Sequence, residues 1–443
     1  MKNKSIKSLA AAAILASASL SAPGVFAANP YGIVYSGGEP LSASNVQIKP
    51  NLVEELTSLI PISGVNTTFS SSSKWKDGYY KSGENCFPVK YVDVSLNDAI
   101  TPGDNVSLAF SKNQYTAVVS FKNITLDGVT DGSKRVPVSI IPSQTSIYGG
   151  WTVYSDATCT DYFPGYSNLS AKNGERIFAE MNIKLYREGQ ETVFTADDLY
   201  FGITDIDASQ SFKILNTGNA FSPSNMFAKN AADLQTTDPN ITLRNMYVAN
   251  GNYLYTQYDP ETGVGLDTPN NSNIYTKLTK QTQQDGLNVV FGFSGGAASA
   301  IEYYAKQYKV TYDSDKSGTV SGITEEQIIS GSYPSGSTTT PNDGYEFSYW
   351  LADSDITLND GTVIKAGSPI SLDQIKEVVV NQDIIFTAIH KSIEKPIAVP
   401  NTGESTKDVN AILASTSIIG VLLGALFIRA LPRILHKRVD FEK

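Results

Sequence analysis

Histidine is almost absent from this chain. Only two of its 443 residues are histidines, His390 and His436, and His436 lies in a basic stretch near the C-terminus. A Ser-His-Asp triad, a Cys-His dyad or a histidine-ligated zinc site needs at least one imidazole. Each of these sites would have to use His390. The scarcity therefore argues against hydrolases of these types and against histidine-ligated metal centres.

Cysteine is equally scarce, with Cys86 and Cys159 as the two examples. In an exported protein these two residues could close one disulfide around roughly 70 residues, which stabilises the fold by about 4 kcal/mol on the chain-entropy model. Two free thiols are the alternative. The sequence leaves both states open.

An excess of positive charge is also missing. The chain has 34 Lys and Arg residues against 44 Asp and Glu residues, a formal net charge of -10. Nucleic acids and anionic membrane surfaces are recognised by clustered Lys and Arg side chains, so neither is expected as a partner. The glycines at 295 and 296 are not followed by the lysine spacing of a phosphate-binding loop. No organic cofactor is expected.

Long apolar runs are restricted to the two ends of the chain. At the N-terminus, three lysines precede an apolar stretch from Leu9 to Leu20, and small residues follow up to Ala27. This order predicts a secretory signal peptide over residues 1–27, cleaved after Ala27 or Ala28. The apolar stretch is too short to span a membrane.

At the C-terminus, residues 411–428 form an apolar run without charge, and four basic residues follow within residues 429–438. At 1.5 Å per residue the run makes roughly 27 Å of helix, close to the roughly 30 Å hydrocarbon core of a bilayer. Basic residues stay on the cytoplasmic side. The pattern predicts a transmembrane helix over 411–428, a cytoplasmic tail over 429–443, and an extracellular location for everything before them.

A short motif lies between the main part of the chain and this apolar run. Its residues are Val399, Pro400, Asn401, Thr402 and Gly403, within a linker over 392–410. Together with the apolar span and the basic tail, the motif resembles the Leu-Pro-any-Thr-Gly cell-wall sorting signal of Gram-positive surface proteins. The resemblance implies that a sortase cleaves after Thr402 and joins its carboxyl group to a cell-wall precursor. Pro400 favours the extended backbone that such cleavage needs. Because valine replaces the family's leucine, a plain single-pass membrane anchor is the alternative.

Between these ends, residues 28–73 read as an irregular lead-in with one short helix near Asn51–Leu59. From residue 74 to 306, apolar and polar residues alternate between turn residues. The clearest strands are 115–124 and 177–186, with Met181, Ile183 and Leu185 on one face of the second. Residues 273–278 and 287–293 are further strands.

The strand pattern over 74–306 predicts a mainly β protein, with a β-sandwich or jelly roll that divides into one or two subdomains. It is similar to the lectin-like β-sandwich domains of bacterial surface adhesins. Within it, Asp205 and Asp207 would point to the same face of a strand and could share a Ca²⁺ ion. An Asx-rich turn that ends the strand is the alternative.

Residues 307–391 form a separate module in this interpretation. Its opening segment 308–315, middle segment 343–350 and closing segment 383–389 resemble the internalin B-type repeat, a small β-grasp-like spacer of bacterial surface proteins. Tyr349 replaces a glycine of that family and His390 replaces a tryptophan. The predicted aromatic core is formed by Tyr345, Phe347 and Trp350.

These features predict a cell-surface adhesin or ligand-binding protein that a sortase attaches to the cell wall, with an unknown glycan or protein as its ligand. Two alternatives stay open. One is a structural, pilin-like subunit, although Ser332-Tyr333-Pro334-Ser335 lacks the lysine of a pilin motif. The other is a surface glycosidase, which needs a pair of carboxylates at a separation that sequence does not reveal. We expect no enzymatic activity.

Overall fold

The computed structural model describes residues 29–33, 39–40, 47–48, 56–163, 165–204, 210–219, 226–228, 246–249, 253–256 and 274–394. These residues form a mainly β structure, as the sequence predicts, with several sheets, two short α-helices and two 3-10 turns. No helix within these ranges is long and apolar enough to cross a bilayer. The predicted signal peptide, the sorting motif and the apolar run over 411–428 all lie outside the described residues.

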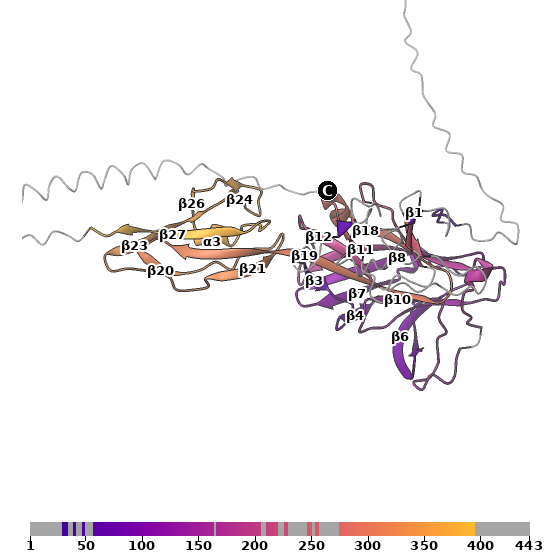
Figure 1. Cartoon of the computed structure of the whole chain (residues 1–443). Coiled ribbons are helices and arrows are strands. Elements are labelled where there is room, and N and C mark those ends of the chain that lie inside the picture. The colour runs from indigo at the N-terminus through magenta and orange to yellow at the C-terminus, as the bar shows by residue number, and fades with distance from the viewer. Residues whose placement is uncertain are drawn as a thin grey trace, which may run out of the picture. The chain divides into compact units, whose positions relative to one another are not determined.

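Two large sheets account for most of the strands up to residue 306, a part of the chain that we call the body (residues 56–306). The first sheet has the order β1-β15-β16-β13-β18-β11-β8-β7-β4. Its strands are β1 (Glu39–Pro40), β15 (Met246–Ala249), β16 (Tyr253–Thr256), β13 (Gln210–Ile214), β18 (Leu287–Phe293), β11 (Arg176–Arg187), β8 (Tyr115–Asp127), β7 (Ser107–Lys112) and β4 (Asn66–Phe69). Figure 1 shows β8, β11 and β18 lying beside one another in this sheet.

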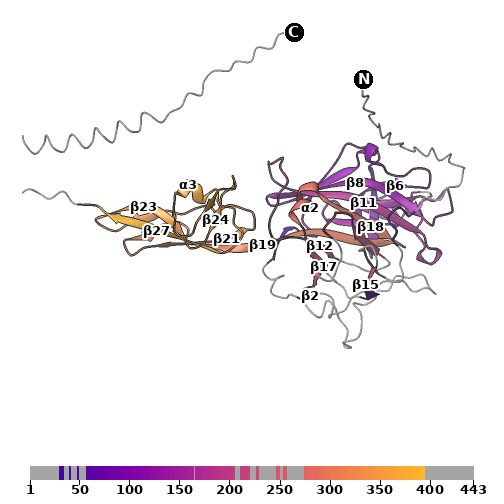
Figure 2. The ribbon, with the colours of Figure 1, turned by 90° about the horizontal axis from the view of Figure 1, so that it is seen from above.

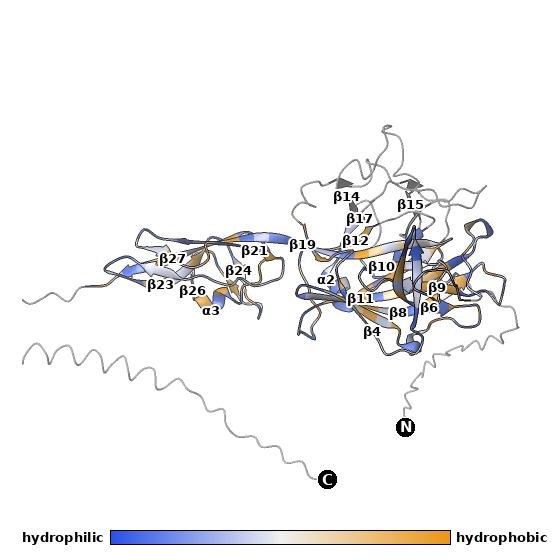
Figure 3. Ribbon diagram, turned by 90° about the horizontal axis from the view of Figure 1, so that it is seen from below, coloured by the Kyte–Doolittle hydropathy of each residue, from blue (hydrophilic) through white to orange (hydrophobic). Residues whose placement is uncertain are grey.

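The second sheet follows the order β2-β14-β17-β12-β19-β10-β9-β6-β5, and β3 (Leu56–Ile60) also pairs with β19. Its strands are β2 (Gln47–Ile48), β14 (Met226–Ala228), β17 (Ile274–Lys277), β12 (Leu199–Thr204), β19 (Ala297–Ser314), β10 (Ser146–Gly149), β9 (Val136–Ile140), β6 (Asn85–Val94) and β5 (Lys76–Ser82). In Figure 3 the orange, apolar residues concentrate along the strands, whereas blue, polar residues are common at the turns.

The two sheets share one hydrophobic core. Phe212 and Phe291 of the first sheet and Phe201 of the second are all fully buried in it. The rings of Phe212 and Phe291 meet edge to face at 4.4 Å between centroids. Burial of each such side chain stabilises the fold by about 1.5–3 kcal/mol. The body is therefore two sheets held together by the apolar faces that they turn toward each other.

The clearest sequence-predicted strands are confirmed. The strand predicted at 177–186 is β11, and Met181, Ile183 and Leu185 all point into the core. The strand predicted at 115–124 is β8, which runs three residues further. A β-bulge at Lys122 shifts the register between β8 and β11. Because of this extra residue, Phe121 and Ile124 both face the core although they are three positions apart.

The predicted helix near 51–59 is wrong in its described part. Residues Leu56–Ile60 form β3, which pairs with β19, and β4 pairs with β7 at the edge of the first sheet. The apolar spacing in this segment fits a helix, but β3 satisfies backbone groups on one side of β19 that would otherwise lack partners. The stretch that we read as an irregular lead-in therefore supplies strands to both sheets.

β19 leaves the body and continues as the first strand of a second sheet over residues 307–391, which we call the module (Figures 1 and 2). There it pairs with β21 (Glu325–Ile329) in antiparallel and with β27 (Ile384–Ser392) in parallel orientation. β23 (Tyr345–Ala352) lies beyond β27 and also pairs with β26 (Pro369–Ile370). Two small pairs, β20 (Gly318–Val320) with β22 (Thr339–Pro341) and β24 (Ile356–Thr357) with β25 (Val363–Ile364), complete the strands.

The short helices are α2 (Lys280–Asp285) in the body and α3 (Leu372–Ile375) in the module. The module has its own core around Tyr312, Trp350 and Phe386, which is separate from that of the body. The prediction that Tyr345 and Phe347 form this core with Trp350 holds only in part, because they are 38% and 39% exposed. The ring of Phe347 nevertheless packs against those of Trp350 and His390, with 6.0 Å between centroids in each pair.

Candidate functional site

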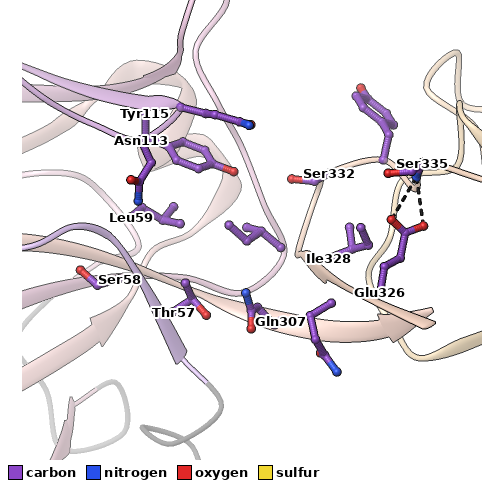
Figure 4. Close-up of a pocket in the computed structure, with 14 residues that line it drawn as sticks. Thr57, Ser58, Leu59, Asn113, Tyr115, Gln307, Glu326, Ile328, Ser332 and Ser335 are labelled. Carbon is purple, nitrogen blue, oxygen red and sulfur yellow. Dashed lines mark hydrogen bonds between the residues drawn. The ribbon is translucent and has the colours of Figure 1, made fainter. Parts of the chain in front are cut away.

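A cavity with a volume of about 460 Å³ lies where β19 passes from the body into the module. Figure 4 shows side chains facing each other across it. Thr57, Ser58 and Leu59 of β3 line it together with Tyr115, at the start of β8. The opposite wall comes from β21 and the loop that follows it. The volume falls in the usual range for small-molecule sites.

The lining of this cavity is polar and almost uncharged. Amide groups come from Asn113, Gln114, Gln307 and Gln327, and hydroxyl groups from Thr57, Ser58, Ser332 and Ser335. Amides donate and accept hydrogen bonds at neighbouring atoms, and hydroxyls do both at one atom. Tyr115 and Tyr333 add aromatic surface. The cavity therefore offers many neutral hydrogen-bonding groups and two rings.

The turn between β7 and β8 places two of the amides at the rim. Asn113 has a φ of 53° and so lies in the left-handed region, which asparagine tolerates better than most residues. This residue allows β7 to reverse within Asn113 and Gln114, and both side chains are exposed. The amide of Glu188 donates to the carbonyl oxygen of Gln114 at 2.8 Å, which fixes the turn against the end of β11.

Glu326 is the one carboxylate among the described residues that line the cavity, and it is already engaged. Its two oxygens accept from the backbone amide of Ser335 at 3.0 and 3.2 Å, and Oε1 also accepts from the Tyr312 hydroxyl at 2.6 Å. Burial, and then the hydrogen bond to Glu326, raise the pKa of Tyr312, which keeps this phenol protonated as a donor. Glu326 therefore holds in place the loop that follows β21, which contains Ser335.

Arg187 fastens the same loop from the side of the body. Its guanidinium donates to the carbonyl oxygen of Gly331 at 3.3 Å and to the hydroxyl of Ser332. It also lies over the rings of Phe194 and Tyr333, at 5.0 and 5.4 Å from their centroids. Cation–π contacts of this kind orient an aromatic side chain. Tyr333 is thus positioned at the cavity while 41% of it remains exposed.

One hydroxyl on the cavity wall has an unused hydrogen-bonding capacity. The Oγ atom of Ser58 is buried and has no hydrogen-bond partner among the described residues. Leaving a buried polar group unpaired costs about 1–3 kcal/mol, so such groups call for an explanation. Because the atom is itself closed off from solvent, a molecule in the cavity does not reach it.

The described lining of the cavity lacks the carboxyl pair that a glycosidase uses. Glycoside hydrolysis uses two carboxyl groups on either side of the scissile bond. Among the described residues that line the cavity, Glu326 alone carries one, and its oxygens are occupied by Ser335 and Tyr312. What the walls do provide is a set of directional hydrogen bonds and aromatic surface, which recognise a molecule by its shape.

The two cysteines are joined in the structure. The Cys86–Cys159 disulfide has an S–S distance of 2.02 Å and a Cα–Cα distance of 5.8 Å. It joins the loop between Tyr154 and Tyr162, two residues that pair with each other, to the start of β6. The carboxylate of Asp156 accepts hydrogen bonds from Thr158, Thr160 and Asp161 within this loop. The disulfide therefore stabilises a surface loop of the body, away from the cavity.

His390 has the two partners that a catalytic triad would require. Its Nδ1 lies 2.8 Å from Oδ1 of Asp315, and its Nε2 lies 3.2 Å from Oγ1 of Thr339. However, the side chain of His390 is 0% exposed. A general base must contact the substrate from which it takes a proton, and this imidazole is closed off from solvent. These hydrogen bonds instead connect β27 to the β20–β22 pair of the module.

A second cavity of about 280 Å³ contrasts with the first because its walls are charged. Asp93, Asp98 and Arg135 line it, and Asp93 accepts from Lys76 and Arg135. Asp98 in turn forms an ion pair with Lys74 at 2.6 Å. The charges of this cavity are thus balanced within the protein.

The other site residues predicted from sequence lie outside the described residues. These are Asp205 and Asp207, together with the sorting motif over 399–403. In the part of the chain that the structure describes, no group of three or more His, Cys, Asp and Glu side chains could hold a metal ion. The cavity residues were missed because they come from segments far apart in the chain, and no local motif marks them.

Comparisons with known proteins give little further information. No protein-family model matches the chain, and no curated protein matches it. Among solved structures, the N-terminal domain of the Streptococcus gordonii adhesin Sgo0707 is similar with a TM-score of 0.35 and 12% sequence identity. The alignment covers 80% of this chain and 96% of that one. This similarity is too low to assign a family.

Proposed function

We propose that the chain is a cell-surface adhesin or ligand-binding protein that a sortase attaches to the cell wall through residues 399–403. The observation that supports binding is the 460 Å³ cavity, whose walls combine neutral hydrogen-bonding groups with two tyrosine rings. Attachment is supported by the order of the sequence features at the C-terminus, where the motif is followed by the apolar run and then by the basic tail. In this proposal the β structure presents a ligand-binding surface outside the cell and carries out no chemistry.

The partners follow from the same proposal. A sortase and a cell-wall precursor act on Thr402, and a glycan or protein on another surface is the ligand. The membrane is a partner only through residues 411–428 before processing. Calcium at Asp205 and Asp207 is a separate proposal, with the prediction that calcium raises the melting temperature and that Asp207→Ala abolishes the rise. An unchanged melting temperature with calcium and with chelator would contradict it.

Attachment is tested by substitution of Thr402 in the full chain expressed on cells. Thr402→Ala should shift the protein from the cell-wall fraction to the membrane or the medium. Thr406→Ala, four residues further along and outside the motif, is the matched control and should leave the protein in the wall. Equal wall recovery of both variants would overturn the sorting proposal.

Binding is tested with cells that display the full chain, challenged with arrays of immobilised glycans and proteins. The proposal predicts adhesion to a subset of them and its loss in cells that carry Thr402→Ala. Mass analysis of the captured ligand then separates an adhesin from a glycosidase. An intact ligand supports the proposal, and a cleaved glycan would replace it with an enzymatic function.

A further inference from the structure

We propose that the ligand of the cavity between β3, β8 and β21 is a neutral saccharide. The inference rests on the proposed ligand-binding function and adds the chemical class of the ligand. It depends on two observations, which are the hydrogen-bonding character of the walls and the state of their one carboxylate.

The hydrogen-bonding groups of the cavity match adjacent hydroxyls of a sugar ring. Each hydroxyl of a saccharide both donates and accepts, and side-chain amides present a donor and an acceptor at neighbouring atoms. Gln307 and Gln327 lie on the side of β19 and β21, and Asn113 lies on the opposite rim. A ligand between them would be met by amide groups from two directions.

Aromatic surface completes this match. Sugar rings expose C–H groups on their faces, and these pack well against aromatic rings. Tyr333 is 41% exposed, and Arg187 beneath it holds its ring in place. Tyr115 is buried among the residues of the wall, with only 7% of its surface exposed. A cavity of about 460 Å³ has room for a mono- or disaccharide rather than a long chain.

The charge of the cavity selects against acidic saccharides. Glu326 is the one ionic group among the described residues that line it, and no Lys, Arg or His side chain does so. The guanidinium of Arg187 donates hydrogen bonds to Gly331 and Ser332 of the loop. The carboxylate of an acidic sugar would therefore meet the like charge of Glu326 in the wall, whereas the positive charge of Arg187 lies outside the lining, against Ser332 and Tyr333. A ligand cation would find Glu326 already hydrogen-bonded to Ser335 and Tyr312.

An extended peptide is the competing class of ligand. Peptides on β proteins commonly add a strand to a sheet edge and pair through their backbone. The walls of this cavity offer side-chain amides and hydroxyls from separate segments, which suit a compact polyol better than a strand. Binding of peptides in place of glycans is therefore an outcome that would overturn the inference.

The test uses the full chain and an array of neutral saccharides, acidic saccharides and peptides, followed by titration calorimetry with each hit. Neutral saccharides should bind at least about tenfold more tightly than their acidic counterparts. Tyr333→Ala should weaken the neutral hit by about tenfold. Tyr162→Ala removes a tyrosine that is 62% exposed and lies outside the cavity, so this matched control should bind as the unmodified chain does.

A change of charge sharpens the test. Gln327→Lys places a cation on the exposed wall beside Glu326 and should bring acidic saccharides to within about threefold of neutral ones. Melting temperatures of all variants check that the fold is intact. Preference of the unmodified chain for acidic saccharides or for peptides would overturn the inference, as would equal binding by Tyr333→Ala and Tyr162→Ala. These outcomes leave the adhesin proposal standing, whereas failure of displaying cells to adhere to any surface would remove both.

Discussion

The body and the module are built from the same kind of strand but distribute their stability differently. Of the largest fully buried side chains among the described residues, the body contains seven, which are Tyr91, Phe110, Phe178, Phe201, Phe212, Phe291 and Phe293. The module contains two, Trp350 and Phe386. A core shared by two sheets spreads its packing over many large side chains. The smaller core of the module packs mostly aliphatic side chains around these two rings, so loss of one of the rings should have a more complete effect there.

Loss of Trp350 should separate the two regions most clearly. The ring is 1% exposed and packs against Tyr312, with the centroids 5.8 Å apart. Trp350→Ala should destabilise the module by about 3–5 kcal/mol. In calorimetry of the full chain, the transition of the module should move to lower temperature while that of the body stays in place. Phe291→Ala is the mirror experiment and should lower the transition of the body. A uniform shift of both transitions by either variant would contradict the comparison.

The disulfide should act on the body alone. Cys86 and Cys159 close a loop with a sequence separation of 73 residues. Replacing both by serine should cost about 2–4 kcal/mol, because the unfolded chain regains conformational freedom. Urea denaturation followed separately for the two regions measures this effect, and reduction of the unmodified protein should reproduce it. A loss of stability in the module would show that the two regions are coupled through more than β19.

A smaller effect is expected from the close packing at Gly318 in the module. A Cβ atom at this position would lie 2.4 Å from Cε1 of His390. Gly318→Ala should therefore destabilise the module by about 1–3 kcal/mol through overpacking. Gly132→Ala in the body is the matched control, because nothing lies within 4 Å of a Cβ atom there. Chemical denaturation of both variants measures the difference, and equal stabilities would show that the His390 ring moves aside freely.

The smallest effect concerns pH and the Asp315–His390 pair. Burial raises the pKa of Asp315. Hydrogen bonds from the backbone and ring of His390 and from Ser317 lower it by more in total, so the pKa lies below its usual value. A carboxyl group with a lowered pKa in the folded state stabilises the fold above its unfolded pKa, and this contribution is lost as the pH falls. The melting temperature of the module should therefore fall below about pH 4. Asp315→Asn should flatten this dependence, and an unchanged profile would contradict the assignment.

The fold was predictable from sequence where local patterns and pairing agree. Alternation in β11 and the turn residues that follow β18 identified these strands, because one buried face imposes a period of two. The segment 56–60 was misread because its apolar spacing also fits a helix, and only its pairing with β19 decides between the two. Tyr345 and Phe347 were assigned to the core by composition, whereas both are more than a third exposed, although Phe347 still packs against Trp350.

The cavity was not predictable, for a related reason. Its walls come from residues 57–59, 113–115, 307 and 326–335, which no spacing rule connects. Neutral amides and hydroxyls are also common on any surface, so their type carries no signal without their positions. His390, by contrast, attracted attention by its rarity, and burial of its ring shows a structural use.

The parallel pairing of β27 with β19 has a mechanical consequence. Five residue pairs, from Val310–Ile384 to Ser314–Ala388, align the last strand of the module with the strand that leaves the body. Tension applied at residue 392 against the body would load these backbone hydrogen bonds sideways and together, instead of opening them one after another. A chain held at its C-terminal end while its other end grips a surface would thus resist extension at this strand pair before its cores are disturbed.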